Sequence, residues 1–100
     1  MKAYLITPDS QTIDTVEITD LGDIRALVGY DTIESDAVGE AGDRLYFDEE
    51  CFLRGTSGRF RIDTGIPVSG RAVVAGTGED GGLRDVAMAP HDLKTRIKYL

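Results

Sequence analysis

The feature that most constrains this fold is a short apolar run in the third quarter of the chain. Residues 71–75 read Arg-Ala-Val-Val-Ala, and glycines at positions 70 and 76 bound them. Small and β-branched residues between two glycines are typical of a strand that is buried on both faces. Pro67 cannot donate to a strand ladder, so we expect the paired section to begin after it. The rest of the chain is expected to supply strands and helices that cover this centre.

A chain of 100 residues has room for one domain, residues 1–100. Hydrophobic residues make up 41% of it, which favours a globular protein over a disordered one. Cys51 is the only cysteine, so no internal disulfide is possible and a cytoplasmic location is favoured. The apolar runs are far shorter than the ~20 residues of a membrane helix. The apolar stretch near the N-terminus, residues 3–6, is too short for a secretory signal. We therefore expect a cytoplasmic protein without a membrane segment.

The N-terminal third predicts a hairpin followed by a helix. Residues 2–7 and 12–18 are rich in β-branched residues, and Pro8-Asp9-Ser10 between them is typical of a turn. Residues 20–28 place apolar side chains on one helical face. Thr19 or Asp20 is suited to cap this helix, and Gly29 to end it in a left-handed conformation.

The remaining chain alternates short strands with turns. We expect strands at residues 32–35, 44–47, 51–54, 59–62 and 83–88, with a loop at 36–43. The acidic triplet 48–50 is expected to turn a hairpin between two of these strands. A second helix should start at Pro90, with Leu93, Ile97 and Leu100 on one face. Together these elements predict an α+β fold: a mostly antiparallel sheet built from hairpins, with two short helices packed on it, both on one face.

The charge distribution indicates a contact surface. Residues 1–50 carry a net charge of −10 and residues 51–100 a net charge of +3. Rows of carboxylates can imitate a phosphate backbone and occupy a nucleic-acid-binding protein, whereas a solvated loop is the simpler interpretation. The acids between the first helix and the strand at 44–47 are the candidate partner-binding residues: Asp31, Glu34, Asp36, Glu40 and Asp43.

Arginines near Phe52 and Phe60 form the one basic and aromatic cluster in the sequence. They are Arg54, Arg59, Arg61 and Arg71. Arginine beside aromatic rings can bind single-stranded nucleic acid. The net charge of −7 argues against direct nucleic-acid binding, and pairing with the acidic half of the same molecule is the favoured alternative.

One glycine motif formally matches a dinucleotide fingerprint. Residues 76–81 read G-T-G-E-D-G after a strand. In a dinucleotide site these glycines open a helix whose N-terminus meets the pyrophosphate. Here Glu79 and Asp80 would face that anion, and the remaining chain is too short for a strand that carries the ribose-binding acid. We interpret the segment as a flexible turn.

No other motif predicts chemistry. Adjacent carboxylates at residues 48–50 cannot converge on one ion and lack the spacing of a calcium loop. One cysteine and one histidine cannot build a four-coordinate zinc site. Cys51 stands beside Phe52 and Leu53, which is typical of an inert buried thiol. We expect no metal, no cofactor and no enzymatic activity, with a nucleophilic Cys51–His91 pair as the alternative left open.

Four segments together carry a family resemblance: MKAYLITP, LVGYDTIES, LYFDEECFLRG and IPVSGRAVVAGTGEDGG. The chain resembles a group of small uncharacterised proteins encoded by phages, prophages and plasmids, over nearly its whole length. In similar sequences the loop after the central strand holds fewer glycines than here, where Gly81 and Gly82 follow one another. The resemblance implies a bacterial cytoplasmic setting and an accessory role in a mobile element, and it implies no reaction.

These observations favour a protein-binding accessory factor that uses its acidic residues. Its partner would be a host or phage protein, and a nucleic-acid-binding protein is one candidate, since carboxylates complement its basic surface. A nucleic-acid-binding module built on the four arginines is the alternative function.

Overall fold

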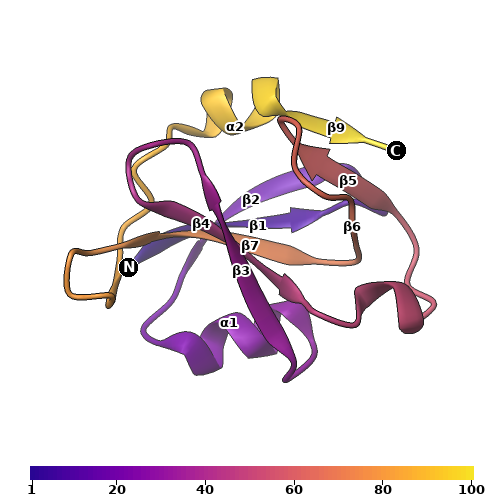
Figure 1. Ribbon diagram of the computed structural model, residues 1–100, viewed down its shortest axis with the longest axis horizontal. Coiled ribbons are helices and arrows are strands. Elements are labelled where there is room, and N and C mark those ends of the chain that lie inside the picture. Colours follow the sequence, from indigo (N-terminus) through magenta and orange to yellow (C-terminus); the bar gives the residue numbers. More distant parts are fainter.

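The computed structural model describes all residues from 1 to 100 and shows a large antiparallel sheet built around the apolar run (Figure 1). In order across the sheet, the strands are β2 (Thr12–Glu17), β1 (Lys2–Thr7), β7 (Ala72–Thr77), β4 (Asp43–Asp48) and β3 (Ile33–Val38). A two-residue strand, β8 (Leu83–Arg84), pairs with the end of β7. The apolar run therefore lies at the centre of the sheet, with β2 and β3 as its two edges.

Both faces of β7 are buried, as the sequence predicts. Ala72 and Val74 pack into one apolar cluster, and Val73 and Ala75 pack into a second cluster on the opposite face. All four side chains are completely buried. A strand whose successive side chains point to opposite faces can be buried in this way only when each face of the sheet is covered.

A small second sheet covers one of these faces. It consists of β6 (Val68–Ser69), β5 (Arg59–Ile62) and β9 (Ile97–Tyr99), in that order and all antiparallel. Phe60, Ile62 and Val68 point from it into the cluster that holds Ala72 and Val74. The larger core therefore lies between the two sheets.

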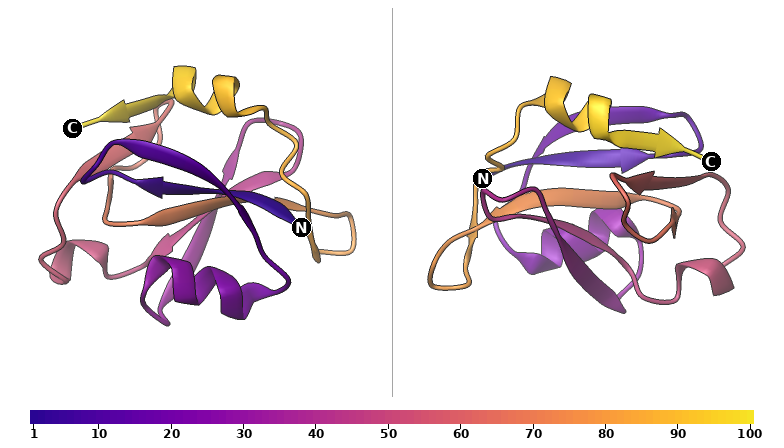
Figure 2. Two further views of the ribbon diagram at one scale, coloured as in Figure 1. Left: turned by 180° about the vertical axis from the view of Figure 1, so that it is seen from behind. Right: turned by 45° about the horizontal axis from the view of Figure 1, so that its top comes forward.

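The two helices lie on opposite faces of the large sheet (Figure 2). The helix α1 (Leu21–Val28) packs Ile24 and Val28 against Val73 and Ala75, whereas α2 (Pro90–Arg96) packs Leu93 into the core between the sheets. The α+β prediction is confirmed, but the expectation of both helices on one face is wrong. A central strand buried on both sides requires cover on both sides.

The caps of α1 are those that the sequence predicts. The Asp20 side chain accepts a hydrogen bond from the backbone N–H of Asp23 at 3.1 Å and so satisfies one free donor at the helix start. Gly29 ends the helix with φ of 95°, in the left-handed region that favours glycine. Capping explains why the boundaries of this helix are readable from local sequence.

The predicted hairpin around residues 48–50 is wrong. Residues 51–53 form a short 3₁₀ helix, η1 (Cys51–Leu53), instead of a strand. Both edges of β4 are already occupied, by β3 and β7, so no edge is left for a following hairpin strand. The Asp48 carboxylate accepts the backbone N–H of Glu50 at 3.1 Å, which turns the chain away from the sheet.

The predicted edge strand at residues 32–35 exists but is longer. β3 continues to Val38 and pairs with β4 over its full length, so the predicted loop at 36–43 shrinks to the turn 39–42. The predicted strand at 83–88 is shorter, since only β8 pairs. Backbone N–H groups beyond it bond to Lys2 O and to the Asp43 carboxylate instead.

The C-terminal helix starts at Pro90 as predicted but ends early. The helical face of Leu93, Ile97 and Leu100 does not form, because Ile97 begins β9 and pairs with Ile62 of β5. Leu93 and Ile97 both pack into the core between the sheets, Ile97 from a strand. Pairing of residues 97–99 with the free edge of β5 is favoured over one more helical turn, because it satisfies several backbone groups at once. None of the helices is long and apolar enough to span a membrane.

Leu93 allows a direct test of how α2 docks. Its side chain is completely buried, whereas Leu53 on η1 is 82% exposed. Leu93→Ala should lower the free energy of unfolding by about 2–5 kcal/mol, because it leaves a cavity in the core. The matched change Leu53→Ala should alter it by less than about 0.5 kcal/mol. Urea unfolding followed by circular dichroism measures both, and equal effects would contradict the packing described here.

Candidate functional site

The exposed edge strand β3 carries two of the five predicted partner-binding acids. Glu34 and Asp36 alternate with Ile33 and Ser35, so both acids point to the face that also holds Val38. Both are exposed, and neither forms an ion pair or accepts a hydrogen bond within the chain. β3 thus offers two uncompensated charges on one side of a free strand edge.

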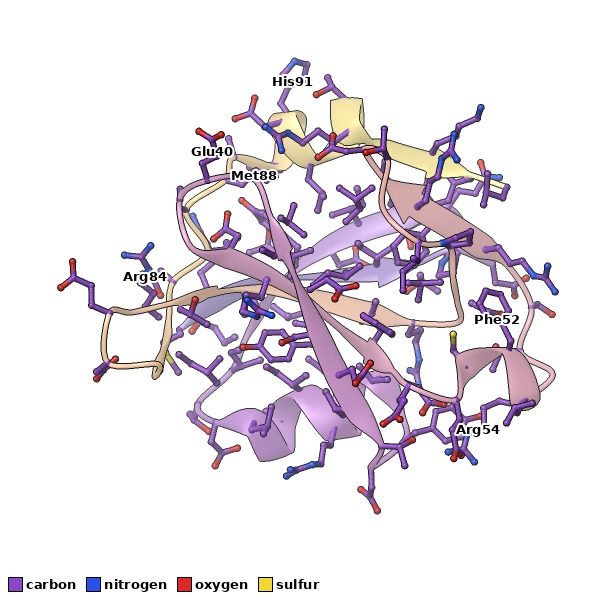
Figure 3. All side chains as sticks on the ribbon, viewed as in Figure 1. Glu40, Phe52, Arg54, Arg84, Met88 and His91 are labelled. Atoms are coloured by element: carbon purple, nitrogen blue, oxygen red, sulfur yellow. The ribbon has the colours of Figure 1, made fainter.

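Asp31 precedes β3 and Glu40 follows it, and both are exposed. Figure 3 labels Glu40 in the turn after β3. Asp43 does not belong with these exposed acids. Its side chain is 2% exposed and accepts the backbone N–H groups of Ala87 at 2.8 Å and Met88 at 2.9 Å. Asp43 is therefore an internal anchor for the segment before α2, and the prediction that it contacts a partner is wrong.

The acids of the first half do not gather on one surface. Asp14 and Glu17 lie on β2, at the opposite edge of the large sheet. They point to opposite faces of that strand, and Glu17 forms an ion pair with the N-terminal amine at 3.2 Å. The negative charge of the N-terminal half is thus spread over several elements, and the two edge strands differ in how their carboxylates are arranged.

A groove runs along the face of β3 that carries the acids. Its volume is about 280 Å³. Val38 and Leu45 line it from the large sheet, and Ile62 and Ile66 line it from the small sheet and the loop after it. Asp36 stands at its rim, and Ile66 is 61% exposed. The groove offers an apolar floor directly beside an uncompensated carboxylate.

The four predicted arginines do not form one cluster. Arg54 is bound internally: its Nε donates to the Asp48 carboxylate at 2.9 Å and its Nη2 lies 3.3 Å from Glu50. Its guanidinium also stacks 4.4 Å from the centre of the Tyr30 ring. This arginine pairs with acids of the N-terminal half, as the alternative interpretation of the sequence expects.

Arg59 and Arg61 share the outer face of the small sheet with Lys98. Lys98 of β9 lies directly opposite Arg61 of β5, and Arg59 stacks 5.1 Å from the centre of the Phe52 ring. None of these three forms an ion pair, and the buried Nε of Arg61 has no hydrogen-bond partner. Sequence reasoning missed Lys98 because it assigned that residue to a helix.

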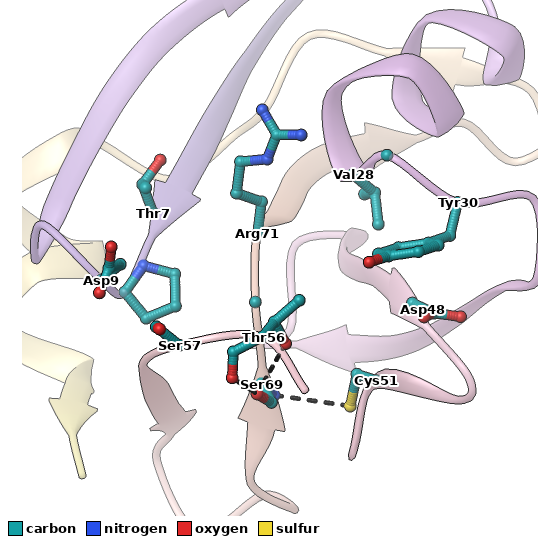
Figure 4. A pocket seen from close by; sticks show the side chains of 13 residues that line it. Thr7, Asp9, Val28, Tyr30, Asp48, Cys51, Thr56, Ser57, Ser69 and Arg71 are labelled. Atoms are coloured by element: carbon teal, nitrogen blue, oxygen red, sulfur yellow. Dashed lines mark hydrogen bonds between the residues drawn. The ribbon is translucent and has the colours of Figure 1, made fainter. Parts of the chain in front are cut away.

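Arg71 stands apart, at the rim of a pocket of about 350 Å³ (Figure 4). Thirteen residues from several distant parts of the chain line this pocket, and only three of them are hydrophobic. They include Tyr30 from the segment after α1, Cys51 from η1 and Ser69 from β6. No local motif marks such a pocket, because its lining converges only when the fold is complete.

The structure does not bring Cys51 and His91 together. Cys51 is buried in this pocket, where its sulfur accepts the backbone N–H of Ser69 at 3.5 Å. His91 is exposed on α2, well away from Phe52, the residue that follows Cys51 (Figure 3). No group of three or more His, Cys, Asp or Glu side chains is arranged to hold a metal ion.

No family model matches the chain, and no curated protein or solved structure does so either.

Asp48 has an environment that makes its contribution to stability depend on pH. Burial acts to raise the pKa of this carboxyl, but hydrogen bonds from Arg54, Thr32 and the backbone N–H of Glu50 outweigh it and lower the pKa below its usual value. The stability that Asp48 contributes is therefore present in full above the unfolded-state pKa of ~3.9. It is lost as the pH falls through the lower folded-state pKa.

We predict that Asp48→Asn lowers the free energy of unfolding by about 1–3 kcal/mol at neutral pH, because it weakens a buried hydrogen-bond network. The difference from the unmodified protein should shrink as the pH falls below ~4, since the unfolded chain then binds a proton at Asp48 that the native protein, with its lower pKa there, does not yet bind. Urea unfolding at a series of pH values measures it. Asp9→Asn, at an exposed acid without a partner, is the control. A deficit that stays constant down to pH 3 would contradict this account.

Proposed function

We propose that this chain is a non-enzymatic protein-binding factor and that its free edge strand β3 is the contact surface. The observation that carries the proposal is the combination on one strand of an unpaired edge, two same-face carboxylates without counterions, and an apolar groove. An exposed strand edge can accept an additional strand from a partner through main-chain hydrogen bonds.

The side chains of β3 define the chemistry of that partner. In an added strand, alternate residues lie beside Glu34, Asp36 and Val38, at the cross-strand distance where opposite charges attract. Lysine or arginine at these positions complements the carboxylates. A large apolar side chain at the end near Val38 complements the groove floored by Leu45 and Ile62. The partner segment is thus extended, basic and partly apolar.

A basic extended segment is a common feature of proteins that bind nucleic acids. Together with the resemblance to proteins encoded by phages and plasmids, this supports an accessory role in a mobile genetic element, in the cytoplasm of a bacterial host. The partner would be a host or phage protein with a basic surface. Attraction between exposed charges weakens with added salt, so such an association should be strongly salt-dependent.

The first test uses a defined probe: a ten-residue peptide that alternates lysine and valine, labelled for fluorescence anisotropy. The double variant Glu34→Gln, Asp36→Asn should bind it about fivefold or more weakly than the unmodified protein, because two cross-strand charge pairs are lost. Ile66→Ser should also weaken binding, since it removes apolar surface from the groove.

The matched control is Asp14→Asn, Glu17→Gln, which removes the same number of carboxylates from the opposite edge strand β2. It should leave the affinity within about twofold, because screening limits the reach of an exposed charge to roughly 10 Å. Equal losses in the two double variants would show attraction to net charge alone and would refute a site on β3.

The second candidate function is nucleic-acid binding by the outer face of the small sheet. The observation that favours it is the row of Arg59, Arg61 and Lys98, which is free of acidic partners, beside the half-exposed ring of Phe52. Cationic side chains with an aromatic platform suit single-stranded nucleic acid. The net charge of −7 opposes it.

A mobility-shift experiment with a single-stranded oligonucleotide at low salt tests this second candidate. If it holds, Arg59→Gln with Lys98→Gln should abolish a shift seen at about 100 µM protein, because phosphate contacts supply most non-specific affinity. Arg25→Gln, at an exposed arginine on α1, is the control and should leave the shift in place. The absence of any shift with the unmodified protein at that concentration would end this candidate.

A further inference from the structure

The pocket beside Arg71 contains a guanidinium and several hydroxyl groups that have no partner within the chain. Arg71 is the one basic side chain in its lining, and it forms no ion pair and no hydrogen bond within the chain. The hydroxyl groups of Thr7, Tyr30 and Ser57 also line the pocket and have no hydrogen-bond partner. Figure 4 shows the Tyr30 hydroxyl directed towards the interior. Unused donors that converge from separate segments call for an acceptor-rich ligand.

The two carboxylates in the pocket lining, Asp9 and Asp48, do not neutralise the charge of Arg71. Asp48 already has its hydrogen bonds from Thr32, Glu50 and Arg54, and its ion pair with Arg54 balances its charge. Asp9 is exposed on the turn between β1 and β2, at the outer side of the pocket. Arg71 is therefore the cation in this pocket that has no counterion of its own.

Close backbone approaches hold the pocket in shape. Gly58 has φ of 82°, and a Cβ atom there would lie 2.5 Å from the backbone nitrogen of Asp9, so only glycine lets the β1–β2 turn pack against the loop before β5. Gly29 makes similar room on the other side: a Cβ atom there would lie 3.1 Å from Nη2 of Arg71. The guanidinium therefore lies beside the end of α1, over the pocket.

The interior completes a site for a small molecule. Pro8, Val28 and Cys51 give it a limited apolar surface, and Thr56 and Ser69 bond to each other at 3.0 Å and so fix one wall. A volume of about 350 Å³ falls within the ~300–1,000 Å³ of ligand pockets. Guanidinium groups pair with carboxylate and phosphate oxygens through two parallel hydrogen bonds.

We propose that this pocket binds a small organic anion whose carboxylate or phosphate group pairs with Arg71 and accepts hydrogen bonds from Thr7, Ser57 and Tyr30. The site shares no lining residue with the groove beside β3, so it is a function separate from partner binding.

The test is a titration of ¹⁵N-labelled protein with inorganic phosphate and, in a second arm, with succinate, at constant ionic strength. Amide signals of residues 7, 9, 29–30, 56–58 and 69–71 should shift in a saturable way with at least one of the two anions. The arm with the lower dissociation constant identifies the anionic group, phosphate or carboxylate.

Arg71→Gln should weaken binding at least about tenfold, because it removes the charged anchor. Tyr30→Phe should weaken it by a few-fold, since it removes only the hydroxyl group. Lys94→Gln, at an exposed cation of α2 outside the pocket, is the control and should leave binding unchanged. The spectrum of each variant reports at the same time whether the fold is intact.

Saturable shifts that survive Arg71→Gln would overturn the proposal, and so would shifts confined to the outer face of the small sheet. No saturable shift with either anion up to about 20 mM, well above the ~1 mM of weak specific binding, would also overturn it.

Discussion

Burial of β7 on both faces is the constraint on which the rest of the structure depends. Its side chains from Ala72 to Ala75 are small or β-branched and completely buried, so the sheet needs apolar cover on each side. α1 supplies one cover, and the small sheet with α2 supplies the other. A chain of 100 residues has few other segments that could cover the sheet. The strand edges β2 and β3 and the outer face of the small sheet are therefore left uncovered.

The two buried acids show how irregular segments are held against such a core. Asp43 begins β4 and Asp48 ends it, and each accepts backbone N–H groups from a segment that has no ladder of its own. Such bonds satisfy backbone donors that have no partner in a strand ladder. The Tyr4 hydroxyl acts in the same region and donates to Met88 O at 2.7 Å. Its pKa is raised by burial and by the nearby charges of Asp43 and Asp92. Acids with internal roles of this kind are indistinguishable in sequence from acids that meet solvent.

The parts of the fold that sequence reasoning predicted are those fixed by neighbours along the chain. The first hairpin, α1 with its caps and the central strand follow from local periodicity and from residues such as Asp20 and Gly29. The errors occur where distant segments compete for the same backbone groups. Residues 51–54 do not pair with β4 as expected, because β7, far away in sequence, already pairs with that strand. Ile97 lies in a strand and not in the expected helix, because it pairs with the free edge of β5.

The candidate sites likewise divide into those made by neighbours along the chain and those made by distant segments. Glu34 and Asp36 could be grouped from sequence because residues close together in the chain stay together in space, whereas the grouping of Arg59 and Arg61 with Lys98 depends on β9. The pocket beside Arg71 was missed altogether, since its donors come from Thr7, Tyr30 and Ser57, which no spacing connects. A local sequence pattern can predict a surface made by one strand. It cannot predict a cavity made by five segments.

Under the proposed function, the contrast between the two edge strands lets one sheet resist self-association and still select a partner. An uncovered edge invites pairing with any extended chain, and inward or outward charges are the usual protection. On β2 the two acids point to opposite faces and one is paired with the N-terminus, so they repel a strand without offering a row of charges to complement. On β3 both acids share one face with a groove, so a second copy of this edge is repelled while a basic strand is favoured. The same carboxylates can therefore supply both the protection and the specificity, provided that they lie on one side of the strand.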